Sequence, residues 1–271
     1  MPIEYKLDEE SQSFAYVPVL NMLQLLLNRS EVLDKVLALD GSACGISSYR
    51  DGTKYSENPF LVAEKFRILL TLYSDEFEIA NPLATSKKKH KMFTVYWVLA
   101  KLPFKYRSSL HAIQLAILCK ASAVKQYGYE KVLQPLVQDL KTLEKHGIFI
   151  ARLGECIGNC SVCLLITLVP IPWQDSKSFI VEHPCRFCMV KKSEIQQRQV
   201  RTGAFESRTK LNHDRQVEEV LKDQSLVKQY GVKGSCVFRE LDYFHTVGGF
   251  PPDLMHDLLE GVIPVEMAVC Q

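Results

Sequence analysis

The chain has 271 residues, of which 47% are hydrophobic and 24% are charged, so we expect a packed core rather than a disordered chain. The formal net charge of +2 is too small to require a nucleic-acid partner, although lysines cluster at 87–91 and at 191–192. No apolar run reaches the roughly 18 residues that a membrane span needs, and the charged N-terminal residues do not resemble a signal peptide. We therefore expect an intracellular protein, nuclear or cytoplasmic, that is not secreted and has no membrane partner. Its nine cysteines are then free thiols or metal ligands rather than disulfides.

The N-terminal part of the chain has the pattern of short helices. Apolar residues recur at helical spacing from Phe14 to Leu39, and Asn28-Arg-Ser30 divides this run into two helices. Gly41 to Pro59 is rich in glycine, serine and tyrosine and is predicted to be a loop, with a further helix over 59–66. We therefore take residues 1–58 as an N-terminal helical segment and loop.

Three strand-like runs and a long helix follow. The runs are Arg67 to Ser74, Met92 to Leu99 and Ala112 to Cys119, and the third is rich enough in Ala and Leu to be a helix instead. Gly128 to His146 has the apolar face of an amphipathic helix. Ile148-Phe-Ile150 then begins another apolar segment, which we take as the fourth strand.

Three strands, a helix and a strand are the opening of an RNase H-like fold. We therefore predict an α/β chain with a partial RNase H-like core over residues 59–184. In that fold, acids from separate strands hold two divalent cations that stabilise the attacking and leaving oxygens of phosphodiester chemistry. Asp75 directly follows the first strand, where the first of these acids is expected. Outside this context, Asp75 would be a surface residue that closes a strand.

Five motifs also occur in a recognisable order. They are Asp75-Glu-Phe-Glu-Ile-Ala-Asn-Pro-Leu83, Lys105-Tyr-Arg-Ser-Ser109, Leu133-Gln-Pro-Leu-Val-Gln-Asp-Leu140, Cys185-Arg-Phe-Cys188 and Pro251-Pro-Asp-Leu-Met-His-Asp-Leu-Leu-Glu-Gly-Val262. In this order the chain, from about Tyr49 onward, resembles the transposase-derived animal proteins related to CACTA-type (En/Spm-like) cut-and-paste DDE transposases. The resemblance implies two Mg²⁺ ions, DNA cleavage and strand transfer, and a Cys/His insertion before the third acid. It also implies that Asp75 is the first catalytic acid and that Asp253 and His256 form an Asp-x-x-His motif.

The chain departs from this family where the second acid is expected. The family motif there resembles Asp-Asn-Leu-Gly-Ala-His-Ser followed by Gly-Phe, but Cys160 to Asp175 contain no such string. Codons for Leu165 to Ser176 can encode that motif in the neighbouring frame, so we hypothesise a compensated frameshift that removes the second carboxylate. Codons in the transcript that cannot encode the motif would exclude this hypothesis. We do not assign Glu260 as the third acid, which is expected beyond Gln271.

Two Cys-x-x-Cys pairs have the spacing of a zinc ribbon. Cys160 with Cys163 and Cys185 with Cys188 would together bind a structural Zn²⁺ through four thiolates. The frameshift hypothesis instead makes the first pair an accident of the wrong frame. In that case only the second pair belongs to a metal site.

The resemblance implies a Cys-Cys-His-His zinc site within the Cys/His insertion, residues 185–250. Cys185, Cys188 and His213 match three of its ligands. Gln216 stands at the expected fourth position, and a neutral amide is a poor zinc ligand. The site is therefore expected to bind Zn²⁺ through three ligands and water, or not at all. The final segment, residues 251–271, is predicted to be a truncated helix that carries the Asp-x-x-His motif.

The sequence thus predicts a transposon-derived, DDE transposase-like protein that is catalytically inactive as it stands. One acid is present, and the family's Mg²⁺ is not expected to function. Two alternatives remain: a non-catalytic, zinc-stabilised module that binds DNA or a partner protein, and a pseudogene product without function. DNA is the expected partner, and the sequence does not predict the oligomeric state.

Overall fold

The computed structural model describes ten stretches of the chain: residues 1–8, 12–38, 52–56, 68–79, 91–107, 109–153, 155–157, 163–166, 181–195 and 203–250. The predicted helices over 59–66 and 251–271, with Asp253 and His256, lie outside these stretches. The chain divides into two compact units, Met1–Val169 with Glu240–Tyr243, and Pro170–Arg239 with Phe244–Gln271.

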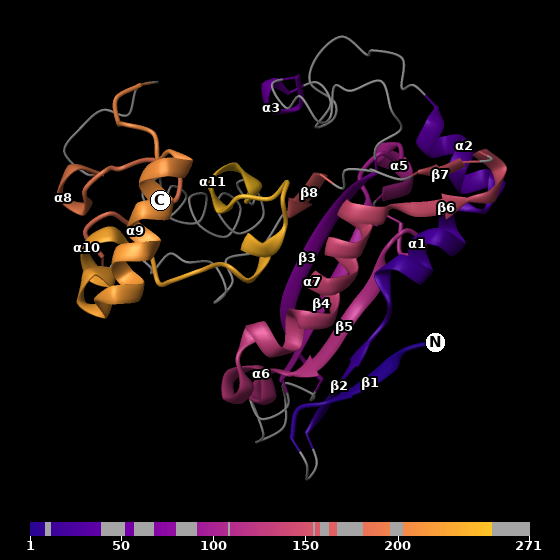
Figure 1. Ribbon diagram of the computed structural model, residues 1–271, viewed down its shortest axis with the longest axis horizontal. Coiled ribbons are helices and arrows are strands. Elements are labelled where there is room, and N and C mark those ends of the chain that lie inside the picture. Colours follow the sequence, from indigo (N-terminus) through magenta and orange to yellow (C-terminus); the bar gives the residue numbers. More distant parts are fainter. Residues whose placement is uncertain are drawn as a thin grey trace, which may run out of the picture. The chain divides into compact units, whose positions relative to one another are not determined.

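The first unit is a mixed α/β structure built on a six-stranded sheet (Figure 1). The strand order is β1 (Ile3–Lys6), β2 (Ser13–Tyr16), β5 (Gln114–Lys120), β4 (Lys91–Leu99), β3 (Leu69–Glu78) and β8 (Cys163–Ile166). Neighbours from β1 to β3 are antiparallel, whereas β8 pairs with β3 in parallel. A parallel pair needs a crossover connection, and helix α7 (Tyr129–His146) lies in the connection between β5 and β8.

The other elements of this unit are short. They are α1 (Val19–Leu27), α2 (Ser30–Leu37), α3 (Thr53–Ser56), α5 (Phe104–Arg107), α6 (Ala121–Tyr127), the 3₁₀ turn η2 (Ala151–Leu153), and the strands β6 (Ile148–Ile150) and β7 (Glu155–Ile157). The two N-terminal helices, the three strands and the long helix of the sequence prediction are therefore confirmed. The third run, which was compatible with a helix, is strand β5.

A strand begins at Ile148 as predicted, but its predicted place as the fourth strand of the main sheet is wrong. Strand β6 pairs with β7 in a separate two-stranded sheet, and the strand beside β3 is β8. Ile148 and Ile150 are buried while Phe149 is 45% exposed. This alternation suits an antiparallel ribbon with one solvated face rather than a parallel strand buried on both faces.

The N-terminal segment is not purely helical, because strands β1 and β2 precede α1. Tyr5 and Phe14 stack across this hairpin with ring centroids 5.4 Å apart. Phe14 and Tyr16 are buried, whereas Ser13 and Ala15, which alternate with them, are partly exposed; this is the two-residue period of a strand. The sequence prediction missed this period because each strand has only four residues.

Helix α7 packs its apolar stripe against the sheet and α1 (Figure 1). The buried stripe consists of Val132, Leu133, Leu136, Val137, Leu140 and Leu143. At its start, Tyr129 meets Phe93 of β4 edge to face, with ring centroids 5.5 Å apart. Within the parts of the chain that the structure describes, no helix combines the length and apolar character needed to cross a bilayer.

Tyr16 joins the N-terminal hairpin to α7. Its hydroxyl donates to Asp139 Oδ2 at 2.7 Å, and the same oxygen accepts the Leu20 N–H at 3.3 Å. The Tyr16 hydroxyl oxygen also accepts the Val19 N–H at 3.3 Å. Because the first N–H groups of a helix have no partner within it, these two side chains cap α1 and bind it to α7. Burial, and then Asp139, raise the pKa of Tyr16 far above its ordinary value, so the hydroxyl remains a donor.

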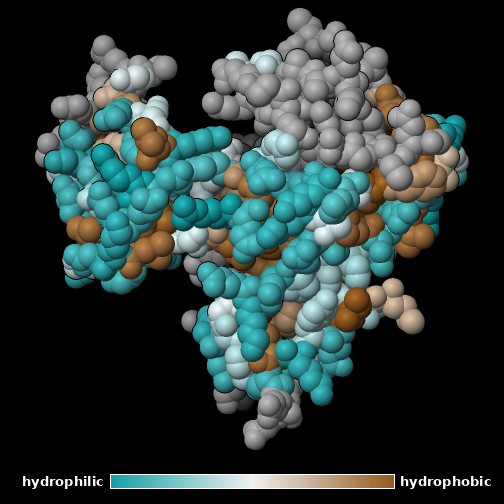
Figure 2. Space-filling model, viewed as in Figure 1, coloured by the Kyte–Doolittle hydropathy of each residue, from teal (hydrophilic) through white to brown (hydrophobic). Residues whose placement is uncertain are grey.

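The second unit consists of short helices. They are α8 (Lys192–Ile195), α9 (Lys210–Lys222), η3 (Gln224–Leu226), α10 (Val227–Tyr230), η4 (Val237–Glu240) and α11 (Thr246–Gly249). Phe244 packs edge to face on Phe238 and on Phe250, with ring centroids 5.6 and 5.2 Å away. Hydrophilic side chains cover much of the visible face of the described residues (Figure 2).

Glu144 of α7 binds a segment that is distant in the sequence. This carboxylate belongs to a side chain that is only 6% exposed, and it accepts the backbone N–H groups of Asp242 and Tyr243 at 3.0 and 3.4 Å. Burial raises the pKa of Glu144, and these two N–H groups lower it. Glu144 therefore fastens residues 240–243 to the first unit.

Replacing Tyr16 with Phe should destabilise the first unit. The change removes the hydroxyl that donates to the Asp139 carboxylate, so we expect the free energy of unfolding to fall by about 1–2 kcal/mol in urea denaturation. Tyr5→Phe, in the neighbouring strand and partly exposed, should change it by less than about 0.5 kcal/mol. Equal losses in the two variants would contradict the role given to Tyr16.

Replacing Glu144 with Ala should cost more, because it leaves two backbone N–H groups without their acceptor. We expect a loss of about 2–3 kcal/mol in the free energy of unfolding. Glu130→Ala, an exposed position in the first turn of the same helix, is the matched control and should lose less than about 1 kcal/mol. A Glu144→Ala variant as stable as this control would show that the segment 240–243 is not held by the carboxylate.

Candidate functional site

Asp75 lies on β3 with an exposed side chain, opposite Thr94 of β4. Strand β8 runs parallel to β3 and ends at Ile166, which pairs with Leu72. Asp75 is therefore three residues further along β3, in the direction in which both strands run. Successive side chains of a strand point to opposite faces, so Glu76 lies on the other face of the sheet.

Among the described residues, Asp75 belongs to no group of three or more converging metal ligands, so the part of the chain that the structure describes does not supply a two-metal centre. Strand β8 contains no carboxylate, and the first acid that follows it in the sequence is Asp175. Two bridged divalent cations need several oxygen ligands, and Mg²⁺ in particular is held by carboxylates. Asp75 alone is not such a ligand set, and no residue is assigned as the third acid. The described residues around Asp75 therefore do not fit two Mg²⁺ ions.

Cys185 and Cys188 lie side by side in the second unit, as the resemblance implies. Cys185 Sγ accepts the Phe187 N–H at 3.3 Å, and Cys188 forms a β-bridge with Ser207. Burial, and then the neighbouring Cys185, raise the pKa of the Cys188 thiol. Both cysteines are free thiols.

A buried cation, Arg208, lies between the thiol pair and Gln216. Arg208 is 6% exposed and donates from Nη1 to Gln216 Oε1 at 2.5 Å. Its Nη2 donates to the carbonyl oxygens of Cys185 and Tyr230 at 3.2 and 3.4 Å. Burial lowers the pKa of Arg208, and the thiols of Cys185 and Cys188 raise it. Gln216, at the expected fourth ligand position, thus accepts a hydrogen bond from Arg208 instead of facing a metal ion.

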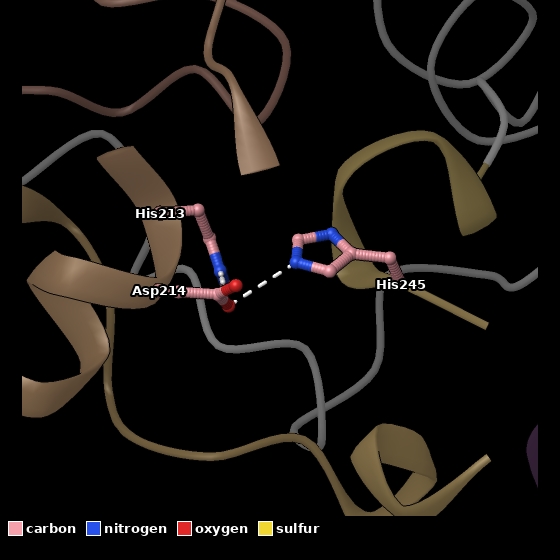
Figure 3. Close-up of side chains that lie close together, drawn as sticks. All are labelled: His213, Asp214 and His245. Atoms are coloured by element: carbon pink, nitrogen blue, oxygen red, sulfur yellow. Dashed lines mark hydrogen bonds and ion pairs between the residues drawn. The ribbon is translucent and has the colours of Figure 1, made fainter. Parts of the chain in front are cut away.

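His213 belongs to a different group of side chains, drawn in Figure 3. Its Nδ1 lies 3.7 Å from Asp214 Oδ1, and His245 Nε2 lies 3.1 Å from the same oxygen. The two imidazole rings meet edge to face with centroids 5.6 Å apart. One ligand atom from each residue lies within 4.8 Å of the other two, which is close enough for one metal ion.

Two helix starts position these residues. Thr209 caps α9 by accepting the Asn212 N–H at 3.1 Å, which places His213 and Asp214 early in the helix. His245 stands just before α11 and accepts the Val247 N–H on Nδ1 at 2.9 Å. The Nε2 atom of His245 is thereby directed to Asp214.

The structure thus brings together only part of the predicted zinc site. Cys185 meets Cys188, but among the described residues the single group of three or more converging His, Cys, Asp or Glu ligand atoms is His213, Asp214 and His245. Asp214 and His245 were not predicted as ligands from the sequence. The His213-Asp214 pair was visible in the sequence, but His245 is 31 residues from Asp214 and no spacing rule joins them.

No family model matches the sequence, and no curated protein matches it.

The environment of His213 keeps its imidazole neutral. Burial, followed by His245 and Arg208, lowers the pKa of His213 to about 4, while Asp214 raises it. Nδ1 is buried without a hydrogen-bond partner. A neutral imidazole has one nitrogen with a free lone pair, which is the form that binds metals.

This pKa predicts how stability depends on pH. The unfolded chain binds a proton on His213 below about pH 6.5, whereas the folded protein binds it only near pH 4, so stability falls as the pH drops through this range. We expect a loss of up to about 3 kcal/mol from this residue in metal-free protein. Urea denaturation of the wild type and His213→Gln between pH 7 and 4 should give a shallower profile for the variant. His146→Gln, an exposed histidine, should leave the profile unchanged; parallel profiles for His213→Gln and the wild type would contradict the assignment.

Proposed function

We propose that the protein is a transposase-derived relative of the DDE enzymes that binds DNA without cutting it. The observation that carries the proposal is the strand arrangement around Asp75. Strands β3, β4 and β5 are consecutive and antiparallel, α7 follows, and β8 lies parallel to β3. The order β5-β4-β3-β8 supports an RNase H-like core, because three strands, a helix and a strand beside the first one define the opening of that fold.

The position of Asp75 supports its assignment as the first acid. It is exposed on the first strand of this arrangement, beyond the point where β8 ends. In an RNase H-like core the second acid follows the fourth strand, so that the two carboxylates approach one another. The proposal takes β8, which pairs with β3 in parallel, as this fourth strand. The hypothesised loss of the second acid is the basis for an inactive centre.

Binding is the activity that an inactive core can retain. We propose DNA as the partner because of the family resemblance and the lysine clusters at 87–91 and 191–192. The net charge of +2 is low, so binding should depend on a few phosphate contacts and weaken as salt rises. Asp253 and His256 remain a predicted structural motif of the same core.

The test is DNA cleavage and DNA binding by one preparation. We expect no nicking of supercoiled plasmid with Mg²⁺ or Mn²⁺, and salt-sensitive binding of duplex DNA in fluorescence anisotropy. Asp75→Asn should change the DNA affinity by less than about twofold, because a solvated carboxylate contributes little to phosphate binding.

Glu78→Gln, on the same strand, is the matched control for Asp75→Asn. Mn²⁺-dependent nicking that disappears in Asp75→Asn and persists in Glu78→Gln would overturn the claim of inactivity. A folded protein with no affinity for DNA at low salt would overturn the DNA partner and favour a protein-interaction module.

A further inference from the structure

We infer that His213, Asp214 and His245 form a binding site for one divalent transition-metal ion of the Zn²⁺ class, separate from the Cys185–Cys188 pair. The inference does not depend on the proposed function, because such an ion can stabilise the second unit whether or not the protein binds DNA.

The geometry around Asp214 supports the site. Asp214 Oδ1 is shared by both histidines, at 3.1 Å from His245 Nε2 and 3.7 Å from His213 Nδ1. His213 is only 5% exposed, and its Nδ1 has no hydrogen-bond partner. Because a buried polar atom without a partner is unfavourable, a ligand for this nitrogen would relieve a specific defect. The side chain of Asp214 is 45% exposed, so an ion can reach the group from solvent.

The donor atoms select the class of metal. Two imidazole nitrogens and one carboxylate oxygen suit Zn²⁺, Co²⁺ or Ni²⁺, whereas Mg²⁺ and Ca²⁺ prefer oxygen ligands throughout. Three protein ligands leave a coordination position for water. The positive charge of Arg208 interacts electrostatically with His213 and repels a metal ion at the site. We therefore expect moderate rather than very high affinity for the metal.

The Cys185–Cys188 pair is not part of this site. The Arg208 guanidinium lies beside both thiols and donates to the Cys185 carbonyl oxygen and to Gln216. A buried cation at that place opposes a metal ion there. The thiol pair and the His–Asp–His group are therefore expected to respond differently to added metal.

Metal binding must also change the hydrogen bonds of His245. In the metal-free protein, Nδ1 accepts the Val247 N–H at 2.9 Å, so in the neutral ring the proton is on Nε2, which faces Asp214. A metal ion binds the lone pair of Nε2, so this proton must move to Nδ1. Protonated Nδ1 no longer accepts a hydrogen bond, and the Val247 N–H loses its partner. Occupation of the site is thus coupled to the turn Thr246–Gly249, which leads towards Asp253 and His256.

The direct test is titration of chelator-treated, tag-free protein with Co²⁺, with Zn²⁺ as competitor. We expect binding of about one equivalent, as for a single three-ligand site, with a visible spectrum that lacks strong thiolate-to-metal charge-transfer absorption. His245→Asn keeps an acceptor for the Val247 N–H and Asp214→Asn keeps the side-chain shape, yet each should weaken binding at least about tenfold.

Two controls separate this site from other sources of metal binding. The double variant Cys185→Ser with Cys188→Ser, and the exposed His146→Asn, should bind Co²⁺ within about twofold of the wild type, because neither removes a donor of the site. A thiolate absorption band, loss of binding in the cysteine variant, or no binding by the wild type would each overturn the site. Binding that survives both His245→Asn and Asp214→Asn would overturn it as well.

Hydrogen exchange tests the coupling to the turn. The Val247 amide should exchange faster after Zn²⁺ is added, while the Asn212 amide, which donates to Thr209 in the cap of α9, should be unchanged. An unchanged Val247 amide in protein that binds Zn²⁺ would refute the proton movement to Nδ1.

Discussion

The apolar stripe of α7 is the contact on which the first unit depends. One helix covers the sheet, contacts α1, and provides Asp139 and Glu144 as acceptors at two points along its length. Its buried residues recur every three or four positions, so a single amphipathic pattern sets both the helix and the face that it covers. The parallel pairing of β3 and β8 requires a crossover of this kind, because a tight hairpin turn can join only antiparallel strands.

The second unit depends on polar groups to a greater degree. Arg208, His213 and Gln216 are all buried there. The described residues of this unit also contain a small aromatic cluster of Phe238, Phe244 and Phe250. Buried polar groups stabilise a fold only when their hydrogen bonds are satisfied. Both Nη atoms of Arg208 donate hydrogen bonds, whereas Arg208 Nε and His213 Nδ1 are buried without a partner. The histidine cluster differs from the thiol pair in that its unpaired nitrogen lies within a group of three metal-ligating side chains.

The sequence predicted the long, strongly periodic elements of the fold and missed the short ones. α7, β3 and β4 each have enough residues for their period to be read directly, whereas β1, β2 and β8 have four residues each. The error at Ile148 has the same origin, since an apolar triplet fits a buried parallel strand as well as a hairpin.

The candidate site was less predictable because its members come from separate helices. Cys185 and Cys188 are three residues apart, so their spacing predicted a metal-binding pair. His213 was predicted as a ligand from the family resemblance. His245 approaches Asp214 only after α9 and the turn at residues 246–249 have formed. The sequence also could not predict the hydrogen bond from Arg208 to Gln216, because this contact depends on the burial of both side chains.

The attachment of residues 240–243 to α7 anchors both ends of the segment 170–239 in the first unit. The chain leaves the first unit after Val169, returns at Glu240, where Lys141 Nζ lies 2.6 Å from Glu240 Oε2, and leaves again after Tyr243. Residues 170–239 therefore form a closed loop whose two ends belong to one folded body. Closing such a loop limits the entropy that the segment gains on local unfolding, so the attachment at residues 240–243 stabilises the folded state of the segment. A single break in the backbone near residue 169 would also leave the second unit joined to the first through residues 240–243.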